Sequence, residues 1–448
     1  MTSRPDAAGL VERVQALLAK RRARDAEALC RQSIDTGEAL AEAWLALGLV
    51  FTSERRFDLA ADAYRRSLAA TVSPWACLYL ALSLHELGET DAAIHEAGQA
   101  VAMAPDLADA HGTLATVLHG VGRSREALAS TEQALRLAPD SHVIVARLAA
   151  IRAELGLFDE AEAAYRQAEA LAPAFRHFGL IGFSRGLWDD IVAAGAAEVP
   201  APAVVRESAA APACPRVALA SCDGRYFTKY AGSFLNSFAA NAADTLLHLH
   251  VFDPGPDFPA ELDALIERTG VTHFRISAER APVDHGDTKA LRTYYSCGRF
   301  LILPQLLEQY QRPIVSLDID ATLTGSLEPL VGSAFDVALL LRKPLDAPWL
   351  DVLAGVAVAT PSPSSREFWS AVRGYLLHFM GRGAMHWHLD QVALYCVLKM
   401  AARFGRPPTV QWLNLGALDM FWHVGHSHDY RMADERYKRY ALPGASAD

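Results

Sequence analysis

The sequence predicts a chain of two dissimilar parts, an all-helical α-solenoid followed by an α/β domain with a mostly parallel sheet. Two observations lead to this fold class. Small residues and prolines recur with a fixed period in the first half, whereas short apolar runs alternate with helical patterns in the second half. A period of roughly 20–50 residues indicates stacked repeats. Alternating strands and helices indicate a parallel sheet covered by helices.

Composition narrows the class of protein before any motif is considered. The chain has 448 residues, of which 51% are hydrophobic, and this content excludes a disordered protein. At roughly 100–200 residues per domain, two or three domains are expected. The 42 Lys and Arg residues are outnumbered by 52 Asp and Glu residues, which gives a net charge of −10. Because broad nucleic-acid binding needs a basic surface, we expect no nucleic-acid partner.

The sequence carries no pattern typical of export or of membrane insertion. Its first residues include Asp6 and Glu12 and lack the apolar core of a signal peptide. No stretch of about 18 residues is apolar enough to span a bilayer. The cysteines lie far apart without a Cys-x-x-Cys pair, as in proteins of a reducing compartment. We therefore expect a cytoplasmic protein with no transmembrane segment.

The first half of the chain is built on a period of 34 residues. Three kinds of residue recur at this spacing, namely Gly88, Gly122 and Gly156; Ala93, Ala127 and Ala161; and Pro105, Pro139 and Pro173. A small residue lets two helices approach closely, glycine takes positive φ in a turn, and proline ends a helix because it has no backbone N–H. Each period therefore predicts two helices joined by a glycine turn.

This pattern resembles the tetratricopeptide repeat family, well over residues 41–173 and poorly over 7–40, in about five units. The resemblance implies an α-solenoid whose concave surface grips an extended peptide or a helix. We therefore expect a protein or peptide partner for this half of the chain. The sequence leaves the oligomeric state open.

Changes of composition predict the domain boundaries. The repeat domain is expected over residues 1–198, with a terminal helix at about 174–196 that covers the last repeat. The stretch 199–215 is rich in Ala and Pro and predicts a semi-extended linker. The α/β domain is then expected over 216–448.

Short apolar runs and helical patterns alternate throughout the second half. The expected strands are 217–222, 246–252, 272–276, 313–320, 336–342 and 355–359, and the expected helices are about 230–241, 259–269, 295–310, 364–379 and 389–403. Parallel sheets of this kind bind their ligands beyond the carboxyl ends of the strands. Functional residues are therefore expected where the apolar runs end.

The most informative short motif is Asp318-Ile319-Asp320, which directly follows the apolar run Ile-Val-Ser-Leu. Two carboxylates at a strand end can converge on one hard cation that also holds a diphosphate. An acidic pair at that position is costly unless a cation neutralises it. The alternative is a pair of solvated acids at the strand tip, and the position after a hydrophobic strand favours a functional site.

The surrounding stretch, residues 294–330, resembles the nucleotide-sugar-dependent glycosyltransferases of the GT-A fold, closest to the retaining glycogenin and bacterial galactosyltransferase type. An Arg-bearing helix, a Pro-Leu-Leu segment, a hydrophobic strand, Asp-x-Asp and Gly-x-Leu-x-x-Leu follow one another in the family's order. The resemblance extends more weakly over 216–432. It implies a Rossmann-like domain, a UDP-sugar or other nucleotide-sugar donor, and Mn²⁺ or Mg²⁺ as cofactor.

The resemblance also implies roles for individual residues. Those implied to bind the nucleotide sugar are Ser221, Asp223, Tyr226, Arg299, Asp318, Gly355 and Arg431, with Lys289 and Arg292 as alternates to Arg299. Asp390 and Gln391 are implied to act at the donor sugar and the acceptor. The metal would be held by Asp318, Asp320 and a late histidine, with His423 as first choice and His426 as second. Each residue also has a structural alternative, and for Asp390 it is a carboxylate that offsets a helix dipole.

Two departures from the family pattern bear on the donor. The family's Asn-Ala-Gly before the mid-domain strand is replaced by Leu353-Ala354-Gly355, so an amide that would contact the sugar is missing. The family's late Lys-Pro-Trp is also absent, and Arg431 stands nearby as a substitute cation. The first departure leaves the identity of the sugar open.

Three functions are compatible with these features. The leading hypothesis is a hexosyltransferase-type enzyme, retaining by resemblance, whose repeats recruit a protein or peptide acceptor. If the reaction inverts instead, Asp390 is the nearest candidate base. The alternative is an interaction scaffold whose α/β domain is catalytically inactive, which the missing amide favours. The third is another user of an Asp-x-Asp pair, such as a nucleotidyltransferase.

Overall fold

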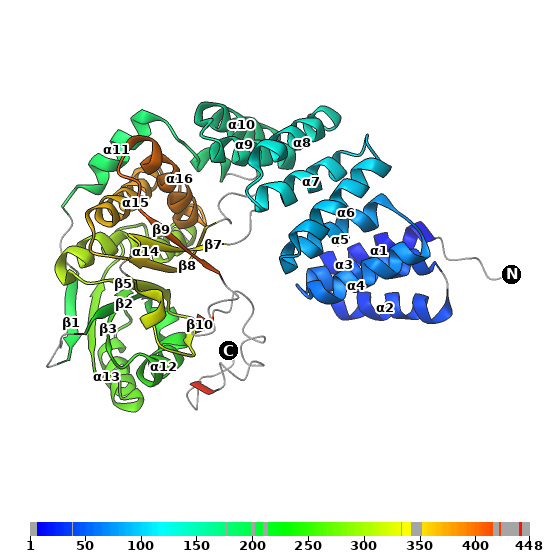
Figure 1. Cartoon of the computed structure of the whole chain (residues 1–448). Coiled ribbons are helices and arrows are strands. Elements are labelled where there is room, and N and C mark those ends of the chain that lie inside the picture. The colour runs from blue at the N-terminus through cyan, green and yellow to red at the C-terminus, as the bar shows by residue number, and fades with distance from the viewer. Residues whose placement is uncertain are drawn as a thin grey trace. The chain divides into compact units, whose positions relative to one another are not determined.

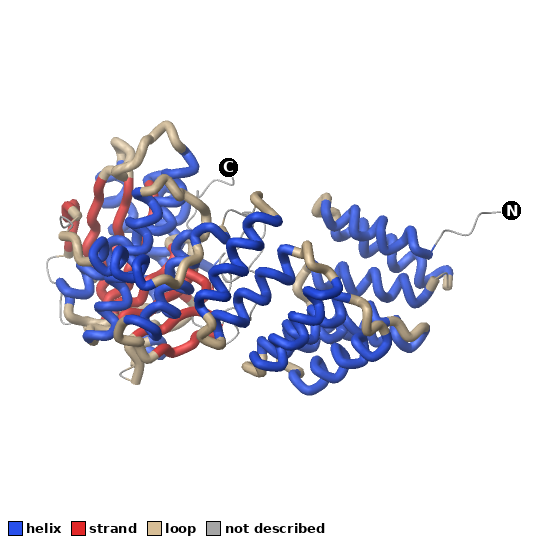
Figure 2. Tube along the Cα trace, turned by 90° about the horizontal axis from the view of Figure 1, so that it is seen from above, coloured by secondary structure: helices blue, strands red, loops and turns tan. Residues whose placement is uncertain are grey.

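The computed structural model describes residues 7–37, 39–174, 177–198, 202–208, 214–332, 334–341, 352–414, 421–422 and 439–440. The described residues up to Ala174 form one compact unit, and those from His177 onward form another. We call them the repeat unit and the sheet unit. Helices alone build the repeat unit, whereas all described strands lie in the sheet unit (Figure 2).

The repeat unit consists of consecutive helix pairs. Its described helices are α1 (Ala7–Ala19), α2 (Ala23–Thr36), α3 (Leu40–Ser53), α4 (Phe57–Ala70), α5 (Pro74–Leu87), α6 (Thr90–Met103), α7 (Ala108–Gly120), α8 (Ser124–Leu137), α9 (His142–Glu154) and α10 (Phe158–Leu171). Each helix packs against the next along the chain (Figure 1). The remaining helix contacts join helices two apart, such as α1 with α3 and α5 with α7. Because these contacts are local in the chain, the fold of this unit follows from the repeat alone.

The residues that define the period take the expected positions. Gly88, Gly122 and Gly156 have φ values of +81°, +79° and +76° in the turns between paired helices. The recurrent alanines of the second helices, such as Ala93, are fully buried. Helix α6 ends two residues before Pro105. The expected helix–turn–helix unit is therefore confirmed, and the weakly patterned region before residue 40 also forms a helix pair.

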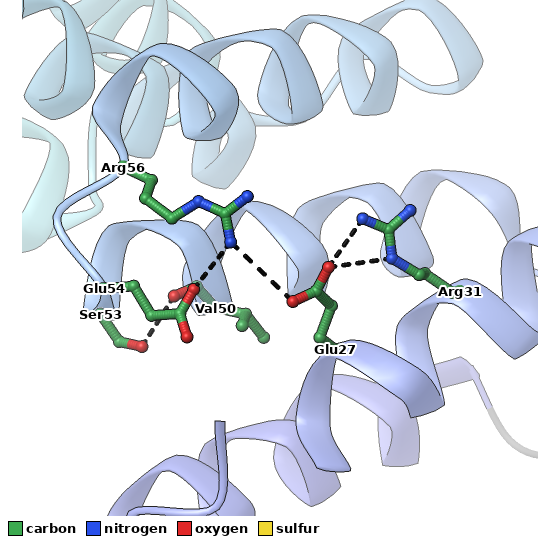
Figure 3. A network of polar contacts seen from close by, with 6 residues as sticks. All are labelled: Glu27, Arg31, Val50, Ser53, Glu54 and Arg56. Atoms are coloured by element: carbon green, nitrogen blue, oxygen red, sulfur yellow. Dashed lines mark hydrogen bonds and ion pairs between the residues drawn. The ribbon is translucent and has the colours of Figure 1, made fainter. Parts of the chain in front are cut away.

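Charged side chains link α2 to the loop between α3 and α4 (Figure 3). Arg56 Nη1 lies 3.0 Å from Glu54 Oε2 and 4.0 Å from Glu27 Oε2, while Arg31 Nη2 lies 2.7 Å from Glu27 Oε1. The guanidinium of Arg56 also lies over the ring of Phe51, 4.6 Å from its centroid. Such partly exposed pairs each contribute little, about 0–1 kcal/mol, so the buried small residues dominate the packing.

The sheet unit is centred on an eight-stranded sheet of order β1-β4-β3-β2-β5-β8-β7-β9. Its strands are β1 (Ala203–Glu207), β2 (Arg216–Asp223), β3 (Thr245–Phe252), β4 (Phe274–Glu279), β5 (Ile314–Asp318), β7 (Val337–Leu341), β8 (Val352–Ala359) and β9 (Val410–Asn414). A second, two-stranded sheet pairs β6 (Thr322–Leu323) with β10 (Phe421–Trp422).

The large sheet is mixed, and most of its pairings are parallel as expected. Strands β4, β3, β2 and β5 run parallel to one another, and β7 runs parallel to β9. The antiparallel strands are β8, which lies between β5 and β7, and β1, which pairs with β4. Buried strands read as continuous apolar runs whatever their direction, so the sequence pattern carried no information on this point.

Helices cover both faces of the large sheet (Figure 1). The helices of this unit are α11 (Arg185–Gly195), α12 (Gly224–Asn241), α13 (Phe258–Thr269), α14 (Thr288–Tyr310), α15 (Pro363–Gly381) and α16 (Leu389–Phe404), with short 3₁₀ turns η1 (Phe178–Leu180) and η2 (Glu328–Leu330). Helices α14, α15 and α16 lie on one face, and α12 and α13 on the other. None of the helices in the described part of the chain combines the length and apolar character needed to cross a membrane.

The helix expected to cover the last repeat is instead part of the sheet unit. It is shorter than expected, and it packs against α15. A Cβ atom on Gly374 would overlap the carbonyl oxygen of Ile191, so the two helix backbones are in direct contact. The hydroxyl of Tyr375 donates to the carbonyl of Leu180, and Arg373 Nη2 donates to that of Ala197 at 2.6 Å. Tertiary packing, which the sequence pattern does not encode, decided this placement.

The expected linker over residues 199–215 also contains structure. Its central residues form β1, which pairs with β4 at the edge of the sheet. Glu207 Oε2 lies 2.7 Å from Arg275 Nη2 on the neighbouring strand. A strand at a sheet edge is stabilised mainly by backbone hydrogen bonds to its neighbour, and these do not depend on side-chain type. The Ala/Pro-rich composition therefore could not distinguish an edge strand from a linker.

Candidate functional site

The sheet has a topological switch between β2 and β5. From β2 the chain continues through β3 to β4 on one side and then crosses to β5 on the other side. Such a switch opens a crevice beyond the carboxyl ends of the two central strands. The register pairs Ser221 with Asp318, so two predicted site residues lie on adjacent strands at this end of the sheet.

A buried arginine meets the end of β5. Arg299 Nη1 forms an ion pair with Asp318 Oδ1, and Arg299 Nη2 donates to the carbonyl of Ala354 at 2.7 Å. Arg299 is only 5% exposed. Burying a guanidinium is expensive unless it is paired and hydrogen-bonded, so this constellation fixes α14, β5 and β8 at one point.

An irregularity in β8 accounts for the acceptor on Ala354. The pairing of β7 with β8 jumps from Leu339–Ala357 to Leu340–Leu353, so the residues between bulge out of the ladder. Gly355 lies in this bulge, one position beyond the Leu317–Val356 pair. A bulge releases backbone groups from strand pairing and re-aims them, often next to functional sites. Here it leaves the Ala354 carbonyl available to Arg299.

Three polar atoms near the switch are buried without a hydrogen-bond partner in the described part of the chain. They are Ser221 Oγ, Arg299 Nε and Gln391 Oε1. An unsatisfied buried polar atom costs about 1–3 kcal/mol. Native proteins leave few such atoms, and each one calls for an explanation such as a ligand or a water molecule.

Asp390 is buried in the first turn of α16. It is 6% exposed, and its Oδ1 accepts a hydrogen bond from the backbone N–H of Gln391 at 2.9 Å. The pKa of the Asp390 carboxyl is raised from 3.8 to about 6, because burial and, to a smaller extent, the charge of Asp318 together outweigh the lowering effect of Arg299. A carboxyl with a pKa near neutrality suits proton transfer. The same position, in the first turn of a helix, also suits a carboxylate that offsets the helix dipole.

The residues predicted to contact the nucleotide lie at the end of β2. Asp223 is the N-cap of α12, and its Oδ1 accepts from the backbone N–H of Tyr226 at 2.8 Å. Tyr226 is 48% exposed, and its ring centroid lies 5.1 Å from that of Tyr230. Asp223 therefore has a structural role at the same strand end, while the ring of Tyr226 is accessible at the rim.

The acidic pair follows the switch directly. Asp318 ends β5, and Asp320 is half-buried in the turn after it, where the backbone N–H of Ala321 donates to the Asp318 carbonyl at 3.1 Å. Among the described residues, no group of three or more His, Cys, Asp or Glu side chains could hold a metal ion. Two carboxylates nevertheless fit Mg²⁺-like cations, which commonly bind one or two carboxylates plus substrate phosphates. His423, His426 and Arg431, the other predicted ligands, lie outside the described residues.

Sequence reasoning missed the carbonyl of Ala354. A backbone acceptor leaves no trace in residue type, and the only signal was Gly355, a glycine inside an apolar run, which can mark a bulge. Sequence reasoning also missed that α16 packs against α14. There the charge of Asp390 adds to the effect of burial in raising the pKa of the Cys297 thiol.

A family model of the tetratricopeptide repeat matches residues 11–71 and 113–174. The N-terminal region therefore carries tetratricopeptide repeats, a module of protein–protein interaction. A search of curated proteins found no match to this sequence.

Solved structures of repeat proteins resemble part of the chain. TTC0263 of Thermus thermophilus, described as a thermophilic TPR protein, is 22% identical, with a TM-score of 0.36 over 39% of this chain and 96% of that one. YrrB, described as a TPR protein with an unusual peptide-binding site, is 17% identical, with a TM-score of 0.31 over 39% and 90%. MamA is 20% identical, with a TM-score of 0.32 over 36% and 95%. Likenesses of this size carry no argument about what this chain binds.

Proposed function

We propose that this protein is a metal-dependent glycosyltransferase that moves a sugar from a nucleoside-diphosphate donor, a UDP-sugar in the first instance, to a protein or peptide acceptor recruited by the repeats. The observation that carries the proposal is the Arg299–Asp318 pair at the strand switch, next to the buried Ser221 Oγ, which has no partner among the described residues. Gln391 Oε1, on the residue after Asp390, is likewise buried without a partner there. A ligand with several hydrogen-bonding groups would satisfy these atoms.

Arg299 would stabilise the negative charge of the donor. One side of its guanidinium is occupied by Asp318 and Ala354, while its Nε–H has no partner in the described part of the structure. The planar fork of donors suits phosphate oxygens, and a low-dielectric setting strengthens that interaction. Ser221 could then donate its hydroxyl proton to the same ligand from β2.

Asp318 and Asp320 would hold Mn²⁺ or Mg²⁺, with His423 or His426 completing the set. When bound, such an ion neutralises the charge that develops on a departing diphosphate. The role of these two side chains is to present carboxylate oxygens to the ion at the strand end. Because Asp318 also pairs with Arg299, it would tie the cation site to the phosphate-binding arginine.

The transfer itself exchanges one bond at the anomeric carbon. The acceptor hydroxyl oxygen forms a bond to that carbon, and the bond to the diphosphate oxygen breaks, so that the diphosphate leaves with the electron pair. The hydroxyl proton passes to the leaving diphosphate if the reaction retains configuration. If it inverts, Asp390 is the group whose raised pKa suits it to take that proton.

The competing function is an interaction scaffold with an inactive sheet unit. One observation favours it, because Arg299 already neutralises Asp318, so that carboxylate does not require a cation. The two functions make opposite predictions about ligand binding. A scaffold gains no stability from a nucleotide sugar, whereas the enzyme does so when a divalent metal is present.

The test is therefore binding and turnover by the full chain and its variants. We expect a UDP-sugar with Mn²⁺ to raise the melting temperature. The double substitution Asp318→Asn and Asp320→Asn should lower sugar transfer or donor hydrolysis at least about a hundredfold. Asp263→Asn, an exposed carboxylate of α13, is the matched control. Undiminished turnover in a folded double variant would end the proposal, and the absence of any donor-dependent stabilisation would favour the scaffold.

The recruiting role of the repeats has its own test. A variant that begins at residue 175 keeps α11, which packs on the sheet unit, and removes only the repeat unit. We expect it to hydrolyse the donor at the full-length rate but to glycosylate protein acceptors more slowly. Equal glycosylation of protein acceptors by both forms would contradict recruitment by the repeats.

A further inference from the structure

Two histidines of β3 lie in a buried polar cluster between the sheet and α14. His248 and His250 are 2% and 0% exposed, and they share one side of the strand because they are two residues apart. The register places His250 beside Ser277 of β4. Tyr310, the last residue of α14, lies over the same side. The proposed transfer step uses none of these groups.

Three hydrogen bonds join these side chains into one chain. Tyr310 Oη lies 2.7 Å from His248 Nδ1, and His248 Nε2 lies 2.9 Å from Ser277 Oγ. The same Ser277 hydroxyl lies 2.8 Å from His250 Nδ1. His250 Nε2 then lies 3.5 Å from Glu279 Oε1, an ion-pair contact longer than a typical hydrogen bond. The chain therefore runs from Tyr310 to His250 and faces a carboxylate.

With neutral imidazoles, the chain points in one of two directions. Burial is the main reason why the pKa of His248 falls to about 3, so this ring is neutral at physiological pH, and a neutral imidazole carries its proton on one nitrogen. If the His250 proton is on Nε2, Ser277 donates to His250 Nδ1 and accepts from His248 Nε2. The bare His248 Nδ1 then accepts from Tyr310. If the His250 proton is on Nδ1 instead, all three hydrogen bonds reverse.

The charges at the two ends of the chain favour the first direction. The carboxylate of Glu279 attracts the N–H proton to His250 Nε2, which has no hydrogen-bond partner among the described residues. At the other end, Arg275, which also pairs with Glu207 of β1, donates to the Tyr310 hydroxyl. Since this hydroxyl oxygen already accepts a hydrogen bond, its own proton is left for the imidazole.

The remaining polar groups that face the chain do not compete with these charges. Ser221 of β2 lies in register with His250 and carries no charge. Tyr294 of α14 stays protonated, because burial and then the charge of Glu279 raise its pKa. Glu279 is thus the group whose change of charge acts on the chain.

We propose that this chain is a buried proton relay whose direction is set by the charge of Glu279. In the reversal, the proton on His250 Nε2 passes to the carboxylate and each proton in the three hydrogen bonds crosses to its acceptor. Solvent gives one proton to Tyr310, which is partly exposed. One proton is therefore taken up in all, and the neutral carboxyl donates it back to the bare His250 Nε2. No charged imidazole forms in the interior, where it would be costly.

The relay connects two ends of the sheet unit. Glu279 lies in register with Phe252, which lies in register with Asp223 at the carboxyl ends of the strands. Tyr310 lies at the opposite end of the relay, where α14 ends. A change of charge at this edge of the sheet is thereby transmitted to the end of α14. The relay operates without a sugar donor, so it does not depend on the proposed function.

The test follows the ring nitrogens of both histidines by ¹⁵N NMR in the full chain, because their signals distinguish the two tautomers. At neutral pH we expect the proton on Nε2 of both rings. On acidification both should change to Nδ1 together with the carboxyl ¹³C signal of Glu279. Ser277→Ala interrupts the chain, so the change at His248 should be lost while that at His250 remains. Ser237→Ala, a buried serine of α12 on the other face of the sheet, is the control and should leave both changes intact.

A second variant tests the same coupling at constant pH, where unfolding in acid plays no part. Glu279→Ala removes the carboxylate, so the tautomer ratio should shift at both histidines. In the Ser277→Ala background it should shift at His250 alone. A doubly protonated His250 at neutral pH, opposite tautomers in the two rings, or a response of His248 that survives Ser277→Ala would overturn the relay.

Discussion

The repeat unit and the sheet unit differ in how far apart in the sequence the residues that define their structure lie. In the repeat unit, a turn glycine such as Gly88 and a packing alanine such as Ala93 belong to one short helix pair. In the sheet unit, Ser221, Asp318 and Asp390 come from three separate elements and meet only after the sheet has formed. The comparison teaches that a repeat can be derived from its period, whereas a site of this kind depends on strand order.

The largest effect that would sharpen this comparison is expected at Arg299. Arg299→Met removes the buried guanidinium that pairs with Asp318, and breaking a buried pair in this way should destabilise the sheet unit by about 3 kcal/mol. Chemical denaturation gives the magnitude, and hydrogen exchange shows which unit loosens.

Two variants control this measurement. Arg292→Met replaces an exposed arginine of the same helix and should change stability little. The double variant Arg299→Met/Asp318→Asn should recover much of the loss, because both charges are then removed. Equal destabilisation by the single and double variants would show that the pair is not the cause.

The pH dependence of stability gives a second test at Asp390. Its pKa is raised from 3.8 to about 6, so below pH 3.8 the carboxyl is protonated whether or not the chain is folded. As the pH rises from 3.8 through 6, the unfolded state gives up its proton before the folded state does, so the free energy of unfolding falls. The fall is about 3 kcal/mol in all, because each unit of pKa difference corresponds to about 1.4 kcal/mol. Asp390→Asn should therefore stabilise the chain by up to about 3 kcal/mol at pH 8 and have almost no effect at pH 3.5.

Unfolding curves at the two pH values decide between the interpretations of Asp390. A stabilising effect that also lowers turnover is the pattern of a functional residue held at a cost in stability. If Asp390→Asn destabilises the protein equally at both pH values, the carboxyl is a structural hydrogen-bonding group instead.

A somewhat smaller effect is expected where α11 crosses α15. Gly374→Ala places a methyl group against the Ile191 carbonyl, and overpacking of this kind should destabilise the sheet unit by about 2 kcal/mol. Gly381→Ala is the control on the same helix, because a Cβ there meets no atom within 4 Å. Hydrogen exchange should show faster opening of α11 and α15 with the repeat helices unchanged. Unchanged protection of α11 would contradict its assignment to the sheet unit.

The smallest changes in stability are expected in the repeat unit, where Gly→Ala substitutions at two positions should act in opposite directions. Gly88 has φ of +81°, so Gly88→Ala should destabilise the repeats by about 1 kcal/mol. Gly98 lies inside α6 with open space around it, so Gly98→Ala should stabilise them by about 0.5–1 kcal/mol. Thermal unfolding of the repeat unit gives both values. If the two substitutions act with the same sign, the turn geometry is not what defines the period.

Several elements of the fold could be derived from the sequence because the information they need is local. The periodic glycines and prolines predicted the helix pairs, and the apolar runs predicted β2, β3, β4, β5, β7 and β8 within a few residues. Three later strands were missed: β6 and β10 have two residues each and present no pattern, and the five-residue β9 was not predicted either. β1 was missed because an edge strand can form from almost any extended sequence.

The sequence by itself determined the repeat unit and named Arg299, Asp318 and Asp390 as separate candidates, since residue type and spacing are written in the chain. Only the tertiary structure decided that these residues share one place, that the Ala354 carbonyl joins them, and that α11 belongs to the sheet. The physical reason is that strand direction, bulges and helix crossings arise from the packing of distant segments, which no local pattern records.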